Sequence, residues 1–225
     1  MSSQDNLSNA SPEVATERAV AEMEARMQLM LAALPPEGRG VMEEVMTFRK
    51  SITVETDRGA VLMAAAFLDD KLKSLIERRM VQDRKVARRA FEFNGPLGTF
   101  SARINLAYLF GIIPKNAQRD LHTIRAIRNE FAHHAAPLSY DDEKIAPLCD
   151  RLVFYGVRPV AAPGTKFRRA VMGLLSYIAL DNRDLVPIEA AKDFEIESRA
   201  EAYKEVSEVY TRVTGKEYPL KHEHE

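Results

Sequence analysis

The stretch that decides the fold runs from Thr56 to Arg79 and reads TDRGAVLMAAAFLDDKLKSLIERR. Its apolar residues recur every three or four positions, which is the spacing that places side chains on one face of an α-helix. The members of this face are Val61, Leu62, Ala65, Leu68, Leu72, Leu75 and Ile76. Charged residues, among them Asp69, Asp70 and Glu77, fall on the other side. We therefore predict a long amphipathic helix whose apolar face packs into a helical core.

The same spacing recurs along most of the chain. It predicts further helices over residues 41–52, 83–93, 99–110, 114–133, 141–154, 166–180 and 188–213. No stretch shows the sustained alternation that is typical of a strand. The prediction is an all-α protein with a single multi-helix bundle domain of about seven to nine helices over residues 11–214. Residues 1–10 are expected to be a disordered tail and residues 215–225 a polar tail.

A first helix is predicted ahead of this series. Ser11-Pro12-Glu13 has the pattern of a helix start, and Pro35-Pro36 ends the helix. Between them lies a heptad-like stripe made of Val20, Met23, Met27, Met30 and Leu34. This stripe allows two interpretations: a helix that packs on the core of its own chain, or an arm that forms a dimer.

Composition sets limits on location and partners. The longest uninterrupted apolar run, Ala60 to Leu68, falls well short of the ~20 residues of a membrane span. The opening residues do not resemble a secretory signal, and the single cysteine, Cys149, excludes an internal disulfide. A cytoplasmic protein without membrane contact is therefore expected. Lys and Arg number 32 against 33 Asp and Glu, so the chain lacks the basic excess of a dedicated duplex binder.

The clearest loop is Asn94-Gly95-Pro96-Leu97-Gly98, which has two glycines and a proline in five residues. Its N–H groups, just ahead of a helix start at Thr99 or Ser101, are one arrangement that holds an anion. The glycines are more typical of a sharp turn or a close helix approach. Arg103 is placed to reach either the loop or a carboxylate.

A local basic cluster and the histidines were the remaining candidates for chemistry. Arg84, Lys85, Arg88 and Arg89 form the candidate nucleic-acid contact, although such a run is usually a solvated helix face. No His or Cys spacing is typical of a zinc site, and no motif indicates a nucleotide cofactor. The sequence therefore predicts no metal, flavin or nicotinamide.

Residues 91–134 read FEFNGPLGTFSARINLAYLFGIIPKNAQRDLHTIRAIRNEFAHH, and this segment resembles the mannitol operon repressor (MltR) family. The resemblance covers about residues 53–145. It implies an all-helical bundle that represses bacterial transcription. Neither the family pattern nor this chain shows a recognisable DNA-reading module, so the implied regulator is non-enzymatic and acts through a protein partner, with a homodimer also expected. The expected interaction residues are Asn94, Gly95, Pro96, Leu97, Gly98, Ser101, Arg103, Arg125 and Arg128.

A second resemblance supplies the alternative function. Residues 128–133, Arg-Asn-Glu-Phe-Ala-His, resemble the R-x4–6-H motif of HEPN domains, many of which cleave RNA as dimers. The resemblance implies that Arg128 holds a phosphate, that His133 acts as general acid or base, and that Asn129 orients them. The structural interpretation is that Arg128 lies near the buried face and pairs with a carboxylate. Under that interpretation His133 is favoured by its place at a helix C-terminus.

Overall fold

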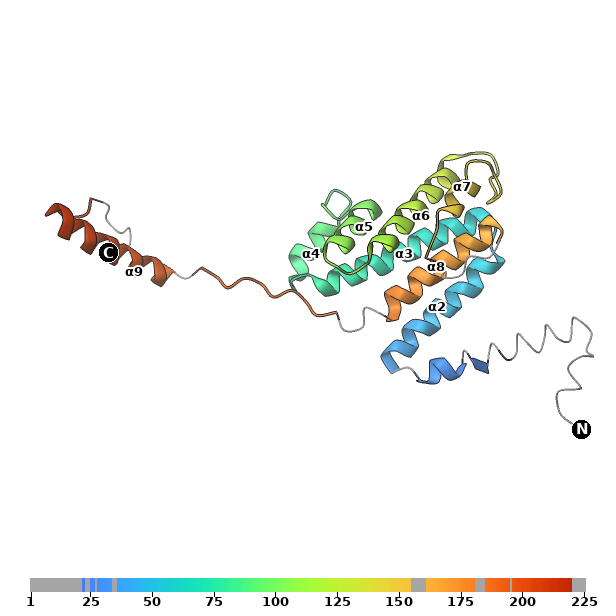
Figure 1. Cartoon of the computed structure of the whole chain (residues 1–225), viewed down its shortest axis with the longest axis horizontal. Coiled ribbons are helices and arrows are strands. Elements are labelled where there is room, and N and C mark those ends of the chain that lie inside the picture. Colours follow the sequence, from blue (N-terminus) through green and yellow to red (C-terminus); the bar gives the residue numbers. More distant parts are fainter. Residues whose placement is uncertain are drawn as a thin grey trace, which may run out of the picture. The chain divides into compact units, whose positions relative to one another are not determined.

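The computed structural model describes residues 28–33, 36–154, 161–180, 185–194 and 196–219, together with residues 22, 25 and 26. Within these residues the chain forms helices and no strand, which confirms the predicted all-α fold (Figure 1). The helices are α2 (Pro36–Val54), α3 (Asp57–Arg79), α4 (Arg84–Phe91), α5 (Phe100–Leu109), α6 (Lys115–His133), α7 (Ala146–Asp150), α8 (Pro163–Leu180) and α9 (Ile196–Thr214). Residues 28–33 are also helical.

Helix α3 is the centre of the bundle. It packs against α2, α5, α6 and α8, and its predicted apolar face is buried except for Leu62, which is 36% exposed. Ala60 and Ala64 are fully buried as well, because neighbouring helices cover more than one side of α3. The helix begins at Asp57, because Thr56 caps it: the Thr56 hydroxyl accepts a hydrogen bond from the Gly59 N–H at 3.1 Å.

The other helices close around this centre. Helix α6 packs on α3, α5, α7 and α8, and α2 packs on α8 as well as on α3. Gly111 follows α5 with a φ of +69°, the left-handed conformation that a glycine adopts at a helix end. The bundle core therefore lies between α3 and the helices α2, α5, α6 and α8.

Two predicted helices are shorter than expected. The helix predicted over 141–154 is limited to α7, Ala146–Asp150. The helix predicted from residue 188 begins only at Ile196. The preceding segment is held in an extended path instead: Arg79 Nη1 donates to the Val186 carbonyl at 2.6 Å, and the Ile188 N–H donates to the Arg79 carbonyl at 2.8 Å.

The contacts divide the chain into two compact units, residues 1–188 and residues 189–225. The single domain predicted over 11–214 crosses this division. Most of the predicted helix over 11–34 lies outside the described residues, including Val20, Met23, Met27 and Leu34 of its stripe. Both interpretations of that stripe therefore stay predictions. Among the described residues, no helix combines the length and the apolar character that crossing a bilayer requires.

Asp120 on α6 is a carboxyl group that the sequence pattern did not single out. It is 1% exposed, and its Oδ2 accepts hydrogen bonds from the Val153 and Phe154 N–H groups at 2.9 and 2.8 Å. Burial raises the pKa of Asp120 above its ordinary 3.8 and outweighs these two hydrogen bonds and the Arg119 charge, which lower it. The carboxyl thus closes the end of the α7 turn from inside the core.

We expect Asp120→Ala to lower the free energy of unfolding by about 2 kcal/mol, because it leaves two backbone N–H groups without an acceptor. Asp120→Asn keeps a carbonyl oxygen of the same size and is expected to cost much less. Urea denaturation of the two variants beside the wild type measures the difference. Equal losses in both variants would show that the hydrogen bonds of Asp120 do not matter for stability.

A comparison of Asp120→Asn with the wild type at several pH values tests the raised pKa of Asp120. The pKa of Asp120 is higher in the folded state than in the unfolded state. The protonated carboxyl therefore makes its whole contribution to the free energy of unfolding below pH 3.8. It is lost as the pH rises through the folded-state pKa. Asp120→Asn does not titrate, so its stability relative to the wild type should increase with pH above 3.8 and then level off. A difference that falls with pH would mean that the hydrogen bonds outweigh burial.

Candidate functional site

The segment that joins α4 to α5, Glu92–Thr99, is called the Gly-Pro loop below. Its backbone is hydrogen-bonded back onto α4 and itself: the Gly95 N–H donates to the Glu92 carbonyl at 2.8 Å, and the Leu97 N–H to the Ala90 carbonyl at 2.8 Å. The Gly98 N–H donates to the Gly95 carbonyl at 3.0 Å. These three N–H groups are therefore not available to an anion. Thr99, rather than Ser101, caps α5, because its hydroxyl accepts from the Ala102 N–H at 3.2 Å.

The two glycines of the loop are required by close backbone approach. A Cβ at Gly95 would lie 2.4 Å from the carbonyl oxygens of Arg89 and Ala90. A Cβ at Gly98 would lie 2.4 Å from the carbonyl oxygen of Phe93. Neither glycine has a positive φ, so the reason is space rather than backbone conformation. Of the two sequence interpretations, the turn with close helix approach is the one that the geometry supports.

Arg103 ties the Gly-Pro loop to the central helix. Its Nη1 lies 2.7 Å from Asp69 Oδ1 on α3, and its Nε donates to the Leu97 carbonyl at 2.8 Å. The guanidinium carbon also lies 5.6 Å from the centre of the Phe91 ring. Arg103 thus reaches both the loop and a carboxylate, the two alternatives that the sequence left open. Because its side chain is only 12% exposed, Arg103 supports the loop from beneath.

The exposed feature of the loop is Phe93, whose residue surface is 89% exposed. The residues on either side of it along the chain are fixed: Phe91 and Leu97 are buried, and Arg103 holds the carbonyl of Leu97. An aromatic side chain is therefore displayed on a backbone that is already ordered. The sequence pattern predicts Phe93 to lie at the end of the helix 83–93. The available signal was an aromatic residue between Glu92 and Asn94 that no apolar stripe accounts for.

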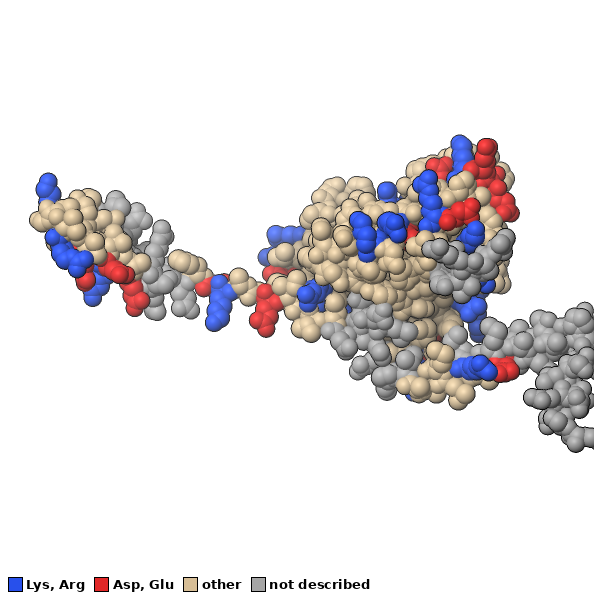
Figure 2. Space-filling model, in the orientation of Figure 1, with Lys and Arg blue, Asp and Glu red and all other residues tan. Residues whose placement is uncertain are grey.

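Helix α4 carries the predicted basic cluster next to this loop. Arg84, Lys85, Arg88 and Arg89 are all exposed. Asp83 is occupied as the cap of the helix, since its Oδ1 accepts from the Lys85 and Val86 N–H groups at 2.9 and 3.0 Å. On the face that Figure 2 shows, acidic and basic side chains are interspersed near α7, where Asp141, Glu143 and Asp150 are exposed beside Lys144 and Arg151.

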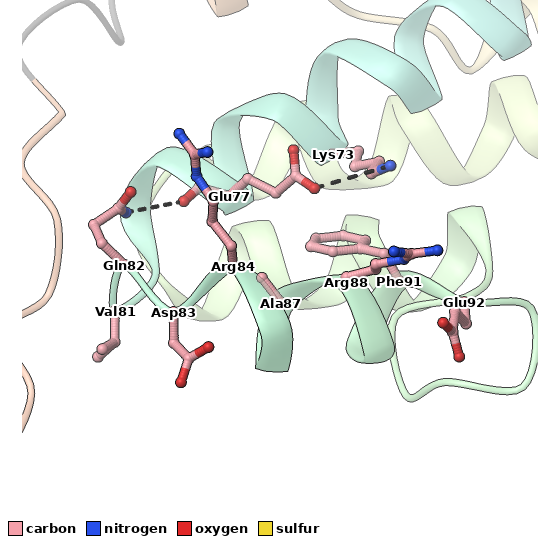
Figure 3. A pocket seen from close by; sticks show the side chains of 10 residues that line it. All are labelled: Lys73, Glu77, Val81, Gln82, Asp83, Arg84, Ala87, Arg88, Phe91 and Glu92. Carbon is pink, nitrogen blue, oxygen red and sulfur yellow. Dashed lines mark hydrogen bonds and ion pairs between the residues drawn. The ribbon is translucent and has the colours of Figure 1, made fainter.

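An open groove of about 500 Å³ runs between the end of α3 and α4 (Figure 3). Val81, Ala87 and Phe91 supply apolar lining, and Arg84 and Arg88 border it from α4. Helix α3 contributes Lys73 and Glu77, and Lys73 Nζ lies 3.9 Å from Glu77 Oε1 and 5.4 Å from the centre of the Phe91 ring. The groove therefore has an apolar floor with charges of both signs at its rim.

The motif of the alternative function lies at the end of α6. Arg128 and His133 are both exposed, and Arg128 Nη1 donates to Asn129 Oδ1 at 3.1 Å. The expectation that Arg128 lies near the buried face is wrong. Two carboxylates of α3 pair with other arginines: Asp69 pairs with Arg103, and Asp57 Oδ1 lies 3.5 Å from Arg168 Nη2.

The chain beyond the motif is fixed by another arginine. Arg58 Nη2 on α3 donates to the carbonyls of His134 and Ala136 at 2.7 and 2.8 Å.

Within the motif itself, His133 lies five positions after Arg128, which places the two side chains about 140° apart around the helix axis. Arg125 is half-buried, and its Nε meets no acceptor among the described residues. A single α6 therefore presents Arg128 and His133 toward different directions.

The remaining histidine of α6 has a structural role. His122 Nε2 lies 2.9 Å from Asn105 Oδ1 on α5. Burial, together with the nearby charges of Arg125 and Lys115, lowers the pKa of His122. Among the described residues, no three His, Cys, Asp or Glu side chains gather in a way that would hold a metal ion.

We expect Arg103→Ala to lower the free energy of unfolding by about 2 kcal/mol, because it breaks a partly buried ion pair and frees the Leu97 carbonyl. Arg84→Ala, which removes an exposed arginine from α4, is the matched control and should change stability by less than about 0.5 kcal/mol. Chemical denaturation of both variants measures this. Equal effects would show that Arg103 does not hold the loop.

Comparison with known proteins adds the following. The sequence model of the mannitol repressor family matches residues 48–160, which include the Gly-Pro loop, Arg103 and all of α6. A chain of the solved MtlR–HPr complex from Escherichia coli is similar with a TM-score of 0.49 and 20% identity, over 60% of this chain and 99% of that one. No curated protein matches the chain in sequence. The family match spans half of the chain, and the protein therefore belongs to the mannitol repressor family.

Proposed function

We propose that this protein is a transcriptional regulator of the mannitol-repressor type that acts through contact with another protein and does not read DNA itself. Family membership supports the regulatory role. The observation that carries the mode of action is Phe93, an aromatic side chain that is 89% exposed on an ordered loop. The Gly-Pro loop is the proposed contact.

The Gly-Pro loop is already ordered before any partner binds. Association costs free energy when loops and side chains must be immobilised, and a fixed backbone reduces that cost. The path of the Gly-Pro loop is fixed by its own hydrogen bonds, by buried Leu97 and by Arg103. Aromatic residues that enter a partner's pocket are common among the few side chains that dominate a protein interface. Phe93 has the position and chemistry of such an anchor.

The neighbouring charges suggest what the partner looks like. Arg88 and Arg89 are exposed in the last turn of α4, directly before the loop. A partner surface with an apolar pocket for Phe93 and an acidic rim would complement this arrangement, and opposite charges would steer its approach. The basic residues of α4 then serve a protein contact rather than phosphate groups.

The test replaces Phe93 in cells by the photo-reactive amino acid p-benzoylphenylalanine and identifies the cross-linked protein. That protein is then purified and titrated with the full chain. Purified HPr is one arm of the titration, because it is the protein named in the similar solved complex. We expect Phe93→Ala to weaken binding about tenfold or more, the effect of losing an interface anchor.

The matched control is Leu109→Ala, which removes a 75% exposed apolar side chain at the far end of α5. It should leave the affinity unchanged. Equal affinity of Phe93→Ala and the wild type would contradict the loop contact. Sequence-specific binding of operator DNA by the chain alone, steeply weakened by salt and by Arg84→Ala with Arg88→Ala, would contradict the proposed mode of action.

The alternative function is a HEPN-like ribonuclease that uses Arg128, Asn129 and His133. One observation favours it: Arg128 and His133 are both accessible to a substrate, and Asn129 holds the Arg128 guanidinium at 3.1 Å. The orientation of these side chains on α6 requires that the residues of two copies combine around one phosphate. In that arrangement Arg128 would stabilise the phosphoryl charge and His133 would transfer a proton.

For the alternative, we expect RNA cleavage by the wild type and its loss in both Arg128→Ala and His133→Ala. Both side chains are exposed, so neither substitution should change the circular dichroism spectrum. His122→Ala is the control, because His122 lies on the same helix outside the motif and contacts Asn105. Absence of cleavage by the wild type, or equal cleavage by all variants, would exclude the ribonuclease.

A further inference from the structure

Helix α9, in the unit formed by residues 189–225, has one side covered by its own chain. Gly215 follows the helix with a φ of +67°, which turns the chain back. The ring of Tyr218 then lies 5.3 Å from the ring of Tyr210 and 5.5 Å from that of Tyr203, edge to face with both. Tyr203, Tyr210 and Tyr218 are accordingly half-buried.

A second apolar stripe lies beside this tyrosine cluster and is uncovered. Val206, Val209 and Val213 follow one another at intervals of three and four residues, so they share one face of α9. They are 49%, 44% and 75% exposed. An isolated helix of this length is only marginally stable in water, and a unit this small has little core of its own. Burial of the valine stripe would supply the missing apolar contact.

The charges along the stripe indicate what covers it. Glu205 and Arg212 are exposed and seven residues apart, so they flank the valines on the same side, opposite to the tyrosine cluster. The pattern is nearly symmetrical about Val209. Val206 lies three residues before it and Val213 four residues after it, while Glu205 lies four residues before it and Arg212 three residues after it. Such a surface is complementary to itself when it is rotated by a twofold axis.

We propose that the valine stripe of α9 binds the same stripe of a second copy of this chain, with the two helices antiparallel. Val209 lies at the twofold axis, and Val206 of each copy meets Val213 of the other. Glu205 of each copy then lies beside Arg212 of the other, so two ion pairs form. A parallel pair would place the Glu205 and Arg212 side chains of the two copies on opposite sides of the valine stripe, so neither ion pair could form.

Cysteine cross-linking of the full chain distinguishes the two orientations. Val206→Cys and Val213→Cys are purified separately and oxidised, either alone or mixed. The antiparallel pair predicts a covalent dimer in the mixture and little in either variant alone, since a disulfide needs Cα atoms within about 7 Å. The native Cys149 does not interfere, because it is fully buried and burial raises the pKa of its thiol to about 12.

Each other outcome overturns the proposal. Cross-linking of Val206→Cys alone would show a parallel pair, and the absence of cross-links in all samples would show that the stripe does not face a second copy. Wild-type protein without added cysteines is the control for adventitious disulfides.

Charge exchange tests the predicted ion pairs independently. Glu205→Arg or Arg212→Glu should each raise the dimer dissociation constant about fivefold, since each affects two symmetric pairs. The double variant should restore the wild-type value. Lys204→Glu, on the opposite side of the helix, is the control and should have little effect. Sedimentation equilibrium measures the constants, and a double variant weaker than both single variants would contradict the antiparallel register.

Discussion

The fold depends on the burial of α3 along nearly its whole length. Four helices, α2, α5, α6 and α8, pack against it, and Leu68, Leu72 and Ile76 are among the largest side chains that are completely buried. A helix covered on several sides must have small residues where its neighbours come closest, and Ala60 and Ala64 fill that role. Because the bundle closes around one helix, a change in the α3 core would disturb the packing of α2, α5, α6 and α8 together.

The polar residues of α3 extend this order to the loops. Asp69 holds the Gly-Pro loop through Arg103, and Arg58 holds the carbonyls that follow α6. Asp57 accepts from the Tyr140 N–H at 3.1 Å, and Arg79 fixes the segment around Val186. Charged groups at the two ends and along the side of one helix thus position loops that are distant in sequence. The proposed contact at Phe93 follows from this arrangement, since an ordered loop binds with less loss of entropy.

The two proposed contact surfaces differ in what makes them available. Phe93 is exposed because buried neighbours and Arg103 fix the loop on both sides of it. The valine stripe of α9 is exposed because Tyr218 covers only the adjacent face of that helix. Buried reactive groups contribute to neither surface: Cys149 and Asp120 lie inside the core, where burial raises both of their pKa values.

Apolar periodicity and local signals were sufficient to predict the helical class, most helix positions and the sharp Gly-Pro loop, because these features depend on residues within a few positions of each other. The sequence alone could not decide which arginines are structural. Arg103 is hydrogen-bonded to a residue 34 positions away, and Arg58 to one 76 positions away, whereas the hydrogen bond of Arg128 within the described part of the chain goes to its neighbour Asn129. Such pairings are set by which helices pack together, so only the tertiary structure showed that Arg103 lies beneath the loop, that Arg128 is exposed and that Phe93 is displayed.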